Sequence, residues 1–109
     1  MTDKLVVLST CKSQSEAEKI ARHLVGQQLA ACVNILPGIR SIFRWQGAVE
    51  EASEVLMVIK TRQDLFESLR EELAKIHSYE VPEILALPIV DGSDPYLAWL
   101  DGTLLRAQT

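Results

Sequence analysis

The sequence predicts an α+β protein with a ferredoxin-like split βαβ sandwich, to which an extended β-hairpin and a C-terminal helix are added. The first observation is the order of its segments: strand, helix, two strands, helix, strand and a last helix. The second is that the first and third strands are apolar on both faces. Right-handed crossovers place these two strands at the centre of a sheet with the order 4-1-3-2. Because the joints are short and no linker interrupts them, residues 1–109 are expected to form a single domain.

The first strand and the first helix are indicated by local signals. Residues 5–8 are a short apolar run, as in a strand that is buried on both faces. Ser13 and Glu16 have the spacing of a capping box, which marks the start of a helix. Apolar residues then recur at helical spacing and form one buried face: Ala17, Ile20, Ala21 and Leu24.

The next two segments read as a long hairpin. Residues 31–46 are strand-like, but Pro37-Gly38 interrupts them and indicates a bulge on an edge strand. Gln46-Gly47 is the tightest place for the turn. Residues 49–61 return, first with a polar half and then with an apolar half, which suits a strand that enters the centre of the sheet.

The C-terminal half predicts a helix, an edge strand and a short last helix. Residues 63–77 carry a single apolar stripe at helical spacing. Residues 81–90 read as a strand, and the two prolines within them favour an edge position. Asp94 followed by Pro95 is typical of an N-cap and a first helical residue.

Composition excludes several classes of protein. The 109 residues contain 11 Lys and Arg against 15 Asp and Glu, so the net charge is −4 and nucleic-acid binding is not expected. The longest apolar runs are about five residues, far short of the roughly 18 that span a membrane. Residues 1–4 show no signal-peptide pattern, and two cysteines are too few for a disulfide framework, so we expect a cytoplasmic protein.

The pattern also predicts self-association. One face of the sheet has no helix of its own, yet the central strands show no polar alternation there. Residues 32–46 would extend roughly 50 Å at ~3.3 Å per residue, so the tip with Phe43 and Trp45 should overhang its own domain. A closed cyclic homo-oligomer, in which each hairpin joins a neighbour's sheet, satisfies both features. The alternative is a hairpin that curls back on its own sheet.

Five segments of the chain together form a set of motifs: residues 29–34 (LAACVN), 45–47 (WQG), 54–61 (EVLMVIKT), 77–84 (HSYEVPEI) and 96–100 (YLAWL). Through these segments, nearly the whole chain resembles the CutA family of divalent-cation tolerance proteins. The resemblance implies a homotrimer with intertwined hairpins, a link to tolerance of copper and other divalent cations, and no established enzymatic reaction. It also implies an architecture similar to that of the trimeric PII signal proteins.

The resemblance points to one candidate metal site. The resemblance implies a copper site whose ligands are one cysteine, at the position of Ser9, and two adjacent histidines, at the positions of Ile76 and His77. This chain keeps His77 alone, and Cys11, on the same strand face as Ser9, is the expected substitute. Copper or another divalent cation is thus a candidate ligand, although no cofactor is expected to be obligatory. The alternatives are a small buried side chain at Cys11, which is also what we expect of Cys32, and a histidine that complements a helix dipole.

A second candidate site would bind a small anion. Lys60 and Thr61 end a central strand at the start of a helix, where backbone N–H groups favour anions. Tyr79 and Glu83 begin the last strand, and the topology allows both places to lie near one end of the sheet. Between subunits they would form a cleft. The alternative is a Lys60–Glu83 ion pair with Tyr79 as an interface residue.

The sequence favours a binding protein over an enzyme. Residues 9–14 lack the arginine and the glycine-rich cradle of an acylphosphatase-like hydrolase, and no Ser-His-Asp set stands out. An RNA-binding module of this topology would expose aromatic and basic residues on its central strands, which here are aliphatic. We expect Phe43, Trp45 and Trp99 to anchor an interface. A sensing trimer and a purely structural trimer both remain open.

Overall fold

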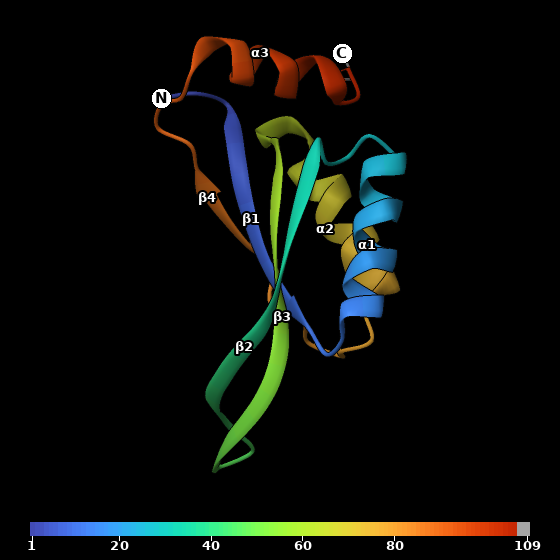
Figure 1. Cartoon of the computed structure of the whole chain (residues 1–109), viewed down its shortest axis with the longest axis vertical. Helices are drawn as coiled ribbons and strands as arrows, with labels where there is room; N and C mark the ends of the chain where they lie inside the picture. Colours follow the sequence, from blue (N-terminus) through green and yellow to red (C-terminus); the bar gives the residue numbers. More distant parts are fainter. Residues whose placement is uncertain (107–109) are drawn as a thin grey trace.

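The computed structural model describes residues 1–106 and shows a four-stranded antiparallel sheet of order β2-β3-β1-β4. This is the predicted order, with β1 and β3 central. The helices α1 and α2 cover one face of the sheet, and α3 lies across one end of it (Figure 1). The elements are β1 (Lys4–Cys11), α1 (Gln14–Gly26), β2 (Cys32–Trp45), β3 (Ala48–Arg62), a 3-10 turn η1 (Gln63–Leu65), α2 (Phe66–Ile76), β4 (Leu85–Pro88) and α3 (Asp94–Thr103).

The core lies between the sheet and the two helices. Alternate residues of the central strands point to this side, as the paired residues Val7 and Ile59 show. The predicted start of α1 is confirmed, because the Ser13 hydroxyl accepts a hydrogen bond of 3.1 Å from the Glu16 N–H. The largest fully buried side chains in this layer are Ile20, Leu24, Met57, Ile59, Leu69, Leu73 and Leu100.

Two predicted boundaries in the last third of the chain are wrong. The last strand was expected over residues 81–90 but covers only Leu85–Pro88, the residues in register with Leu5–Leu8 of β1. The N-cap of α3 is Ser93 rather than Asp94. The Ser93 hydroxyl reaches the N–H of Tyr96 at 3.4 Å, and this makes Asp94 the first residue inside the helix.

The long hairpin overhangs the domain as predicted. β1 ends opposite Val55, so within the described part of the chain residues 48–54 of β3 have only β2 as a neighbouring strand. The expected bulge lies between Leu36 and Ile39, and Gly38 adopts a φ of +79° there. The longest dimension of the molecule is 44 Å, and Figure 1 shows the two-stranded ribbon projecting from the sheet.

The sheet face opposite α1 and α2, here called the open face, is apolar. Val6 and Leu8 of β1 lie on it beside Val58 of β3, and all three are only half-buried. Within residues 1–106, no helix is long and apolar enough to cross a membrane. The large apolar residues that stay exposed on the neighbouring strands and on the hairpin are Leu36, Ile42, Phe43, Trp45, Val49, Leu85 and Leu87, with 41, 69, 41, 50, 67, 56 and 48% of their surface exposed.

Candidate functional site

A group of polar and aromatic residues, the Lys60 cluster, lies where the open face meets α3. It comprises Cys32, Asn34, Lys60, Tyr96 and Trp99. Lys60 is the cross-strand partner of Cys32, and its Nζ donates to Asn34 Oδ1 at 2.8 Å. The same Nζ lies 3.5 Å from the Tyr96 hydroxyl and 5.7 Å from the centre of the Tyr96 ring. The Trp99 ring is 5.4 Å from that of Tyr96, so α3 adds an aromatic wall to the amine.

The amine of Lys60 has only neutral partners within the described chain. Both hydrogen bonds of its Nζ go to uncharged oxygens, and no carboxylate of residues 1–106 pairs with it. The ion pair with Glu83 that the sequence allowed is therefore not formed within a subunit. The two hydrogen bonds replace part of the hydration of the half-buried ammonium, but no negative charge of the described chain balances its positive charge. The cluster is accordingly suited to receive an anion.

Thr61 is adjacent to Lys60 but serves the opposite side of the sheet. Its side chain is fully buried, and its hydroxyl donates to the backbone oxygen of Leu29 at 2.7 Å. This bond holds the segment that leads into β2. The structure therefore does not bring Thr61 and Lys60 together on one surface, because adjacent strand residues point to opposite faces.

His77 lies at the other end of the sheet with both ring nitrogens engaged. Nε2 lies 2.8 Å from the carbonyl oxygen of Thr10, and Nδ1 accepts from the Tyr79 N–H at 3.0 Å. A carbonyl only accepts and an N–H only donates, so these partners fix the neutral tautomer with the proton on Nε2. The side chain is completely buried. A metal ion would have to displace one of these two bonds in order to bind His77.

The segment after His77 is held by two carboxylates. Glu16 accepts from both the N–H and the hydroxyl of Ser78, at 2.8 and 3.0 Å. Burial raises the pKa of Glu16, but the two bonds from Ser78, together with smaller contributions from its surroundings, leave the pKa below its ordinary value. Tyr79 donates its hydroxyl to Glu54 at 2.7 Å. Burial, followed by this bond, raises the pKa of Tyr79 well above its usual range.

The two cysteines differ from their predicted environments. Cys11, which its expected role as a metal ligand requires to be reachable, is fully buried, since it pairs with Val55 and its thiol donates to the Ser13 carbonyl at 3.4 Å. Burial raises the pKa of the Cys11 thiol. Cys32 was expected to be buried but is half-exposed on the open face, and both cysteines are free thiols. Among residues 1–106, no three His, Cys, Asp or Glu side chains are grouped so as to hold a metal.

The sequence had allowed Lys60 and Tyr79 to lie near one end of the sheet, but the structure places them apart. Tyr79 is bonded to Glu54, which precedes Lys60 by six residues along β3. At ~3.3 Å per residue this separates the two places by roughly 20 Å. Glu83 is exposed and lies between α2 and β4. Within one subunit, the single cleft that the sequence predicted thus becomes two separate places.

The comparison with protein families agrees with this architecture. The family described as CutA1 divalent ion tolerance protein matches residues 5–103. The chain belongs to the CutA1 family. The resemblance that the sequence motifs indicated is thereby confirmed.

Curated relatives and solved structures extend the match. The divalent-cation tolerance protein CutA of Thermus thermophilus is 52% identical over 95 residues, which cover 87% of this chain and 92% of that protein. The chloroplastic protein CutA of Arabidopsis thaliana is 50% identical over 88% of this chain, but this chain spans only 53% of its length.

Two solved structures of the CutA1 family have the same fold. That of the Thermus thermophilus protein superimposes with a TM-score of 0.91 at 48% identity, covering 93% of this chain and 98% of that chain. The CutA structure from Xylella fastidiosa gives a TM-score of 0.92 at 37% identity, covering 94% and 99%.

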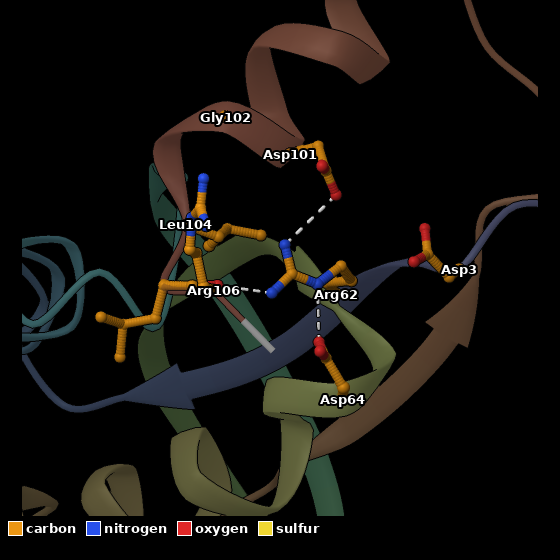
Figure 2. Close-up of a pocket in the computed structure, with 8 residues that line it drawn as sticks. Asp3, Arg62, Asp64, Asp101, Gly102, Leu104 and Arg106 are labelled. Atoms are coloured by element: carbon orange, nitrogen blue, oxygen red, sulfur yellow. Dashed lines mark hydrogen bonds and ion pairs between the residues drawn. The ribbon is translucent and has the colours of Figure 1, made fainter. Parts of the chain in front are cut away.

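One charged network of this CutA1 family member was not found from the sequence. Figure 2 shows Arg62 in the centre of a hollow at the end of the sheet, with bonds to Asp64 at 2.6 Å and to Asp101 at 3.2 Å. Its third bond goes to the backbone oxygen of Leu105, and Lys4 also contacts Asp101, at 3.2 Å. The bond to Asp64 raises the pKa of Arg62, and the bonds from Lys4 and Arg62 lower that of Asp101. The network ties α3 to the sheet. The sequence did not predict it because its residues lie far apart along the chain.

Proposed function

We propose that the chain acts in the cytoplasm as a non-enzymatic homotrimer of the CutA1 family, with a role in the response to metal ions. In this proposal it binds a small anionic ligand or a divalent cation in clefts between subunits. The observation that carries the proposal is the apolar open face, continued by a hairpin that projects beyond its own domain. The names of the relatives, which describe divalent-cation tolerance, support the metal-related role.

The assembly follows from what the subunit leaves uncovered. Phe43 and Trp45 alternate along one face of the ribbon, and each keeps about half of its surface exposed. Large aromatic residues of this kind are the usual anchors of an interface. A ring of identical subunits covers each open face with a neighbour and leaves no sheet edge to extend into fibres. Trp99 would contribute from the end of the sheet.

The ligand would bind at the Lys60 cluster, and the metal at Cys11 and His77. The first place is already exposed at the rim of the open face. The second is closed, because Cys11 and His77 are buried and bonded. Binding of copper there requires the segment around Ser78 and Tyr79 to open. A PII-like signalling trimer, or a structural trimer without a dedicated metal site, is the alternative that this closed arrangement favours.

The proposal is tested by measuring mass and metal binding together. Light scattering of the purified protein should give three times the subunit mass of 12.2 kDa at low concentration. Calorimetric titration with Cu(I), Cu(II) and Zn(II) is then compared between the wild type, Cys11→Ser and His77→Ala. Loss of binding in both variants supports the metal site, whereas binding that neither substitution changes excludes it. A folded monomer would contradict the assembly on which the proposal rests.

A further inference from the structure

We propose that the Lys60 cluster binds a small planar aromatic molecule that carries one anionic group, either a carboxylate or a monophosphate. The inference deepens the proposed function and rests on it, since it assigns a chemical class to the small anionic ligand. It is carried by the five side chains of the cluster, all of which belong to one subunit.

The anionic end of the ligand is specified by the polar atoms of the cluster. Lys60 Nζ donates one hydrogen bond to Asn34 Oδ1 and a second to the Tyr96 hydroxyl, so its third N–H is available to a ligand. The amide nitrogen of Asn34 is a further donor, because its oxygen already accepts from the lysine. The Tyr96 hydroxyl completes the set of donors. An ammonium group surrounded by neutral donors is complementary to a carboxylate or a phosphate.

The aromatic part of the ligand is specified by Tyr96 and Trp99. The centres of their rings lie 5.4 Å apart, with an angle of 42° between the ring planes. Tyr96 keeps 43% of its surface exposed and Trp99 keeps 49%. Exposed aromatic faces of this size favour stacking with another ring. Because Lys60 Nζ is 5.7 Å from the centre of the Tyr96 ring, a ligand that reaches both must be compact. One or two rings with the charge close to them fit this spacing.

The same atoms disfavour a cation at this place. A metal ion would meet the positive charge of Lys60, and the one carbonyl-type oxygen in the cluster, Asn34 Oδ1, already accepts a proton from it. The thiol of Cys32 lies 3.9 Å from that oxygen, and a single sulfur beside an ammonium is an incomplete set of metal ligands. The cluster is therefore distinct in its chemistry from the place of Cys11 and His77.

The test uses calorimetry with defined probes. Benzoate, phenylacetate, phenyl phosphate and adenosine monophosphate are titrated into the wild type, and the last two distinguish a simple aryl phosphate from a nucleotide. Cyclohexanecarboxylate, which has no aromatic ring, and benzyl alcohol, which has no charge, are the ligand controls. We expect saturable binding of at least one aromatic anion, and binding of both controls that is weaker by a factor of about ten or more.

The variants assign the binding to the cluster. Lys60→Met should weaken binding about tenfold or more, Lys60→Arg should retain it within a few-fold, and Trp99→Leu should remove the preference for aromatic over cyclohexane ligands. Lys19→Met, at an exposed position of α1, is the matched control and should bind like the wild type. In a Trp45→Phe background Trp99 is the only tryptophan, and its fluorescence should shift on binding.

Two results would overturn the inference: no saturable binding of any aromatic anion up to about 10 mM, or binding that Lys60→Met and Trp99→Leu leave unchanged. The mass of each sample is measured alongside. A trimer that binds none of the probes refutes the ligand class and leaves the assembly standing. A monomer contradicts the proposed function, and its titration still tests the site because one subunit supplies all five residues.

Discussion

Hydrogen-bond partners decide which of the predicted site residues are available to a ligand. Lys60 and His77 were both chosen from the sequence as polar residues at the ends of elements. The structure leaves the first exposed to an incoming anion and commits both nitrogens of the second to the backbone. Residue type and spacing predict what a side chain is able to bind. They do not predict all the partners that already satisfy it, because some of these, such as Thr10 for His77 and Asn34 for Lys60, lie far away in sequence.

Ser9 is the opposite case to His77, because its polar group is buried but is not satisfied within the described chain. Its side chain is fully buried, and among residues 1–106 its hydroxyl has no hydrogen-bond partner. An unsatisfied buried hydroxyl costs roughly 1–3 kcal/mol, so Ser9→Ala should raise the free energy of unfolding by about 1 kcal/mol in urea denaturation. Ser53→Ala, at an exposed position of β3, is the control and should change it by less than about 0.5 kcal/mol. A loss of stability in Ser9→Ala would show that the hydroxyl has a partner after all.

At the scale of elements, local signals predicted the start of α1 and the bulge and turn of the hairpin better than the extent of β4. The capping box at Ser13, the bulge at Gly38 and the turn at Gly47 each depend on a few neighbouring residues, and the structure has all three. The extent of β4 depends instead on which residues β1 leaves available for pairing. The tie between α3 and the sheet through Arg62 joins residues about 40 positions apart, and no local pattern announces it.

The Arg62 network should stabilise the docking of α3. Arg62→Met removes three hydrogen bonds from a buried guanidinium and leaves Asp64 and Asp101 without it. We expect a loss of about 2 kcal/mol in the free energy of unfolding. Relative to the wild type, amide hydrogen exchange should accelerate more in α3 than in β1. Arg70→Met, whose guanidinium is exposed beside Glu67, should cost less than about 0.5 kcal/mol. Equal losses in the two variants would contradict the role of the network.

The link between α1 and the segment after α2 should depend on pH. The folded pKa of Glu16 is depressed, so its contribution to stability is present above its unfolded pKa of about 4.3 and is lost as the pH falls through the folded value. Urea denaturation between pH 7 and pH 3 should therefore show a smaller loss of stability in Glu16→Gln than in the wild type. Glu18→Gln, at an exposed position of the same helix, should follow the wild type. Parallel curves for all three proteins would exclude the contribution of Glu16.

At the scale of the whole molecule, two faces of the hairpin make the proposed assembly testable with matched substitutions. Phe43 lies opposite Glu50 on the same face as Trp45, and Ile42 lies opposite Glu51 on the other face. A lysine at either position gains a cross-strand partner of opposite charge, so the ribbon itself should persist. If the face of Phe43 is buried between subunits, Phe43→Lys places a charge there at a cost of several kcal/mol per interface.

Light scattering on dilution should then separate the two variants. Phe43→Lys should dissociate to the subunit mass of 12.2 kDa at concentrations where the wild type keeps three times that mass. Ile42→Lys introduces the same charge one residue away and should keep the wild-type mass, although Ile42 is the more exposed of the two, at 69% against 41%. Exposure within the subunit alone predicts the reverse order of sensitivity. Dissociation of Ile42→Lys alone would show that the interface lies on the face of Ile42 rather than on that of Phe43. If neither variant dissociated, Phe43 would not be part of the interface.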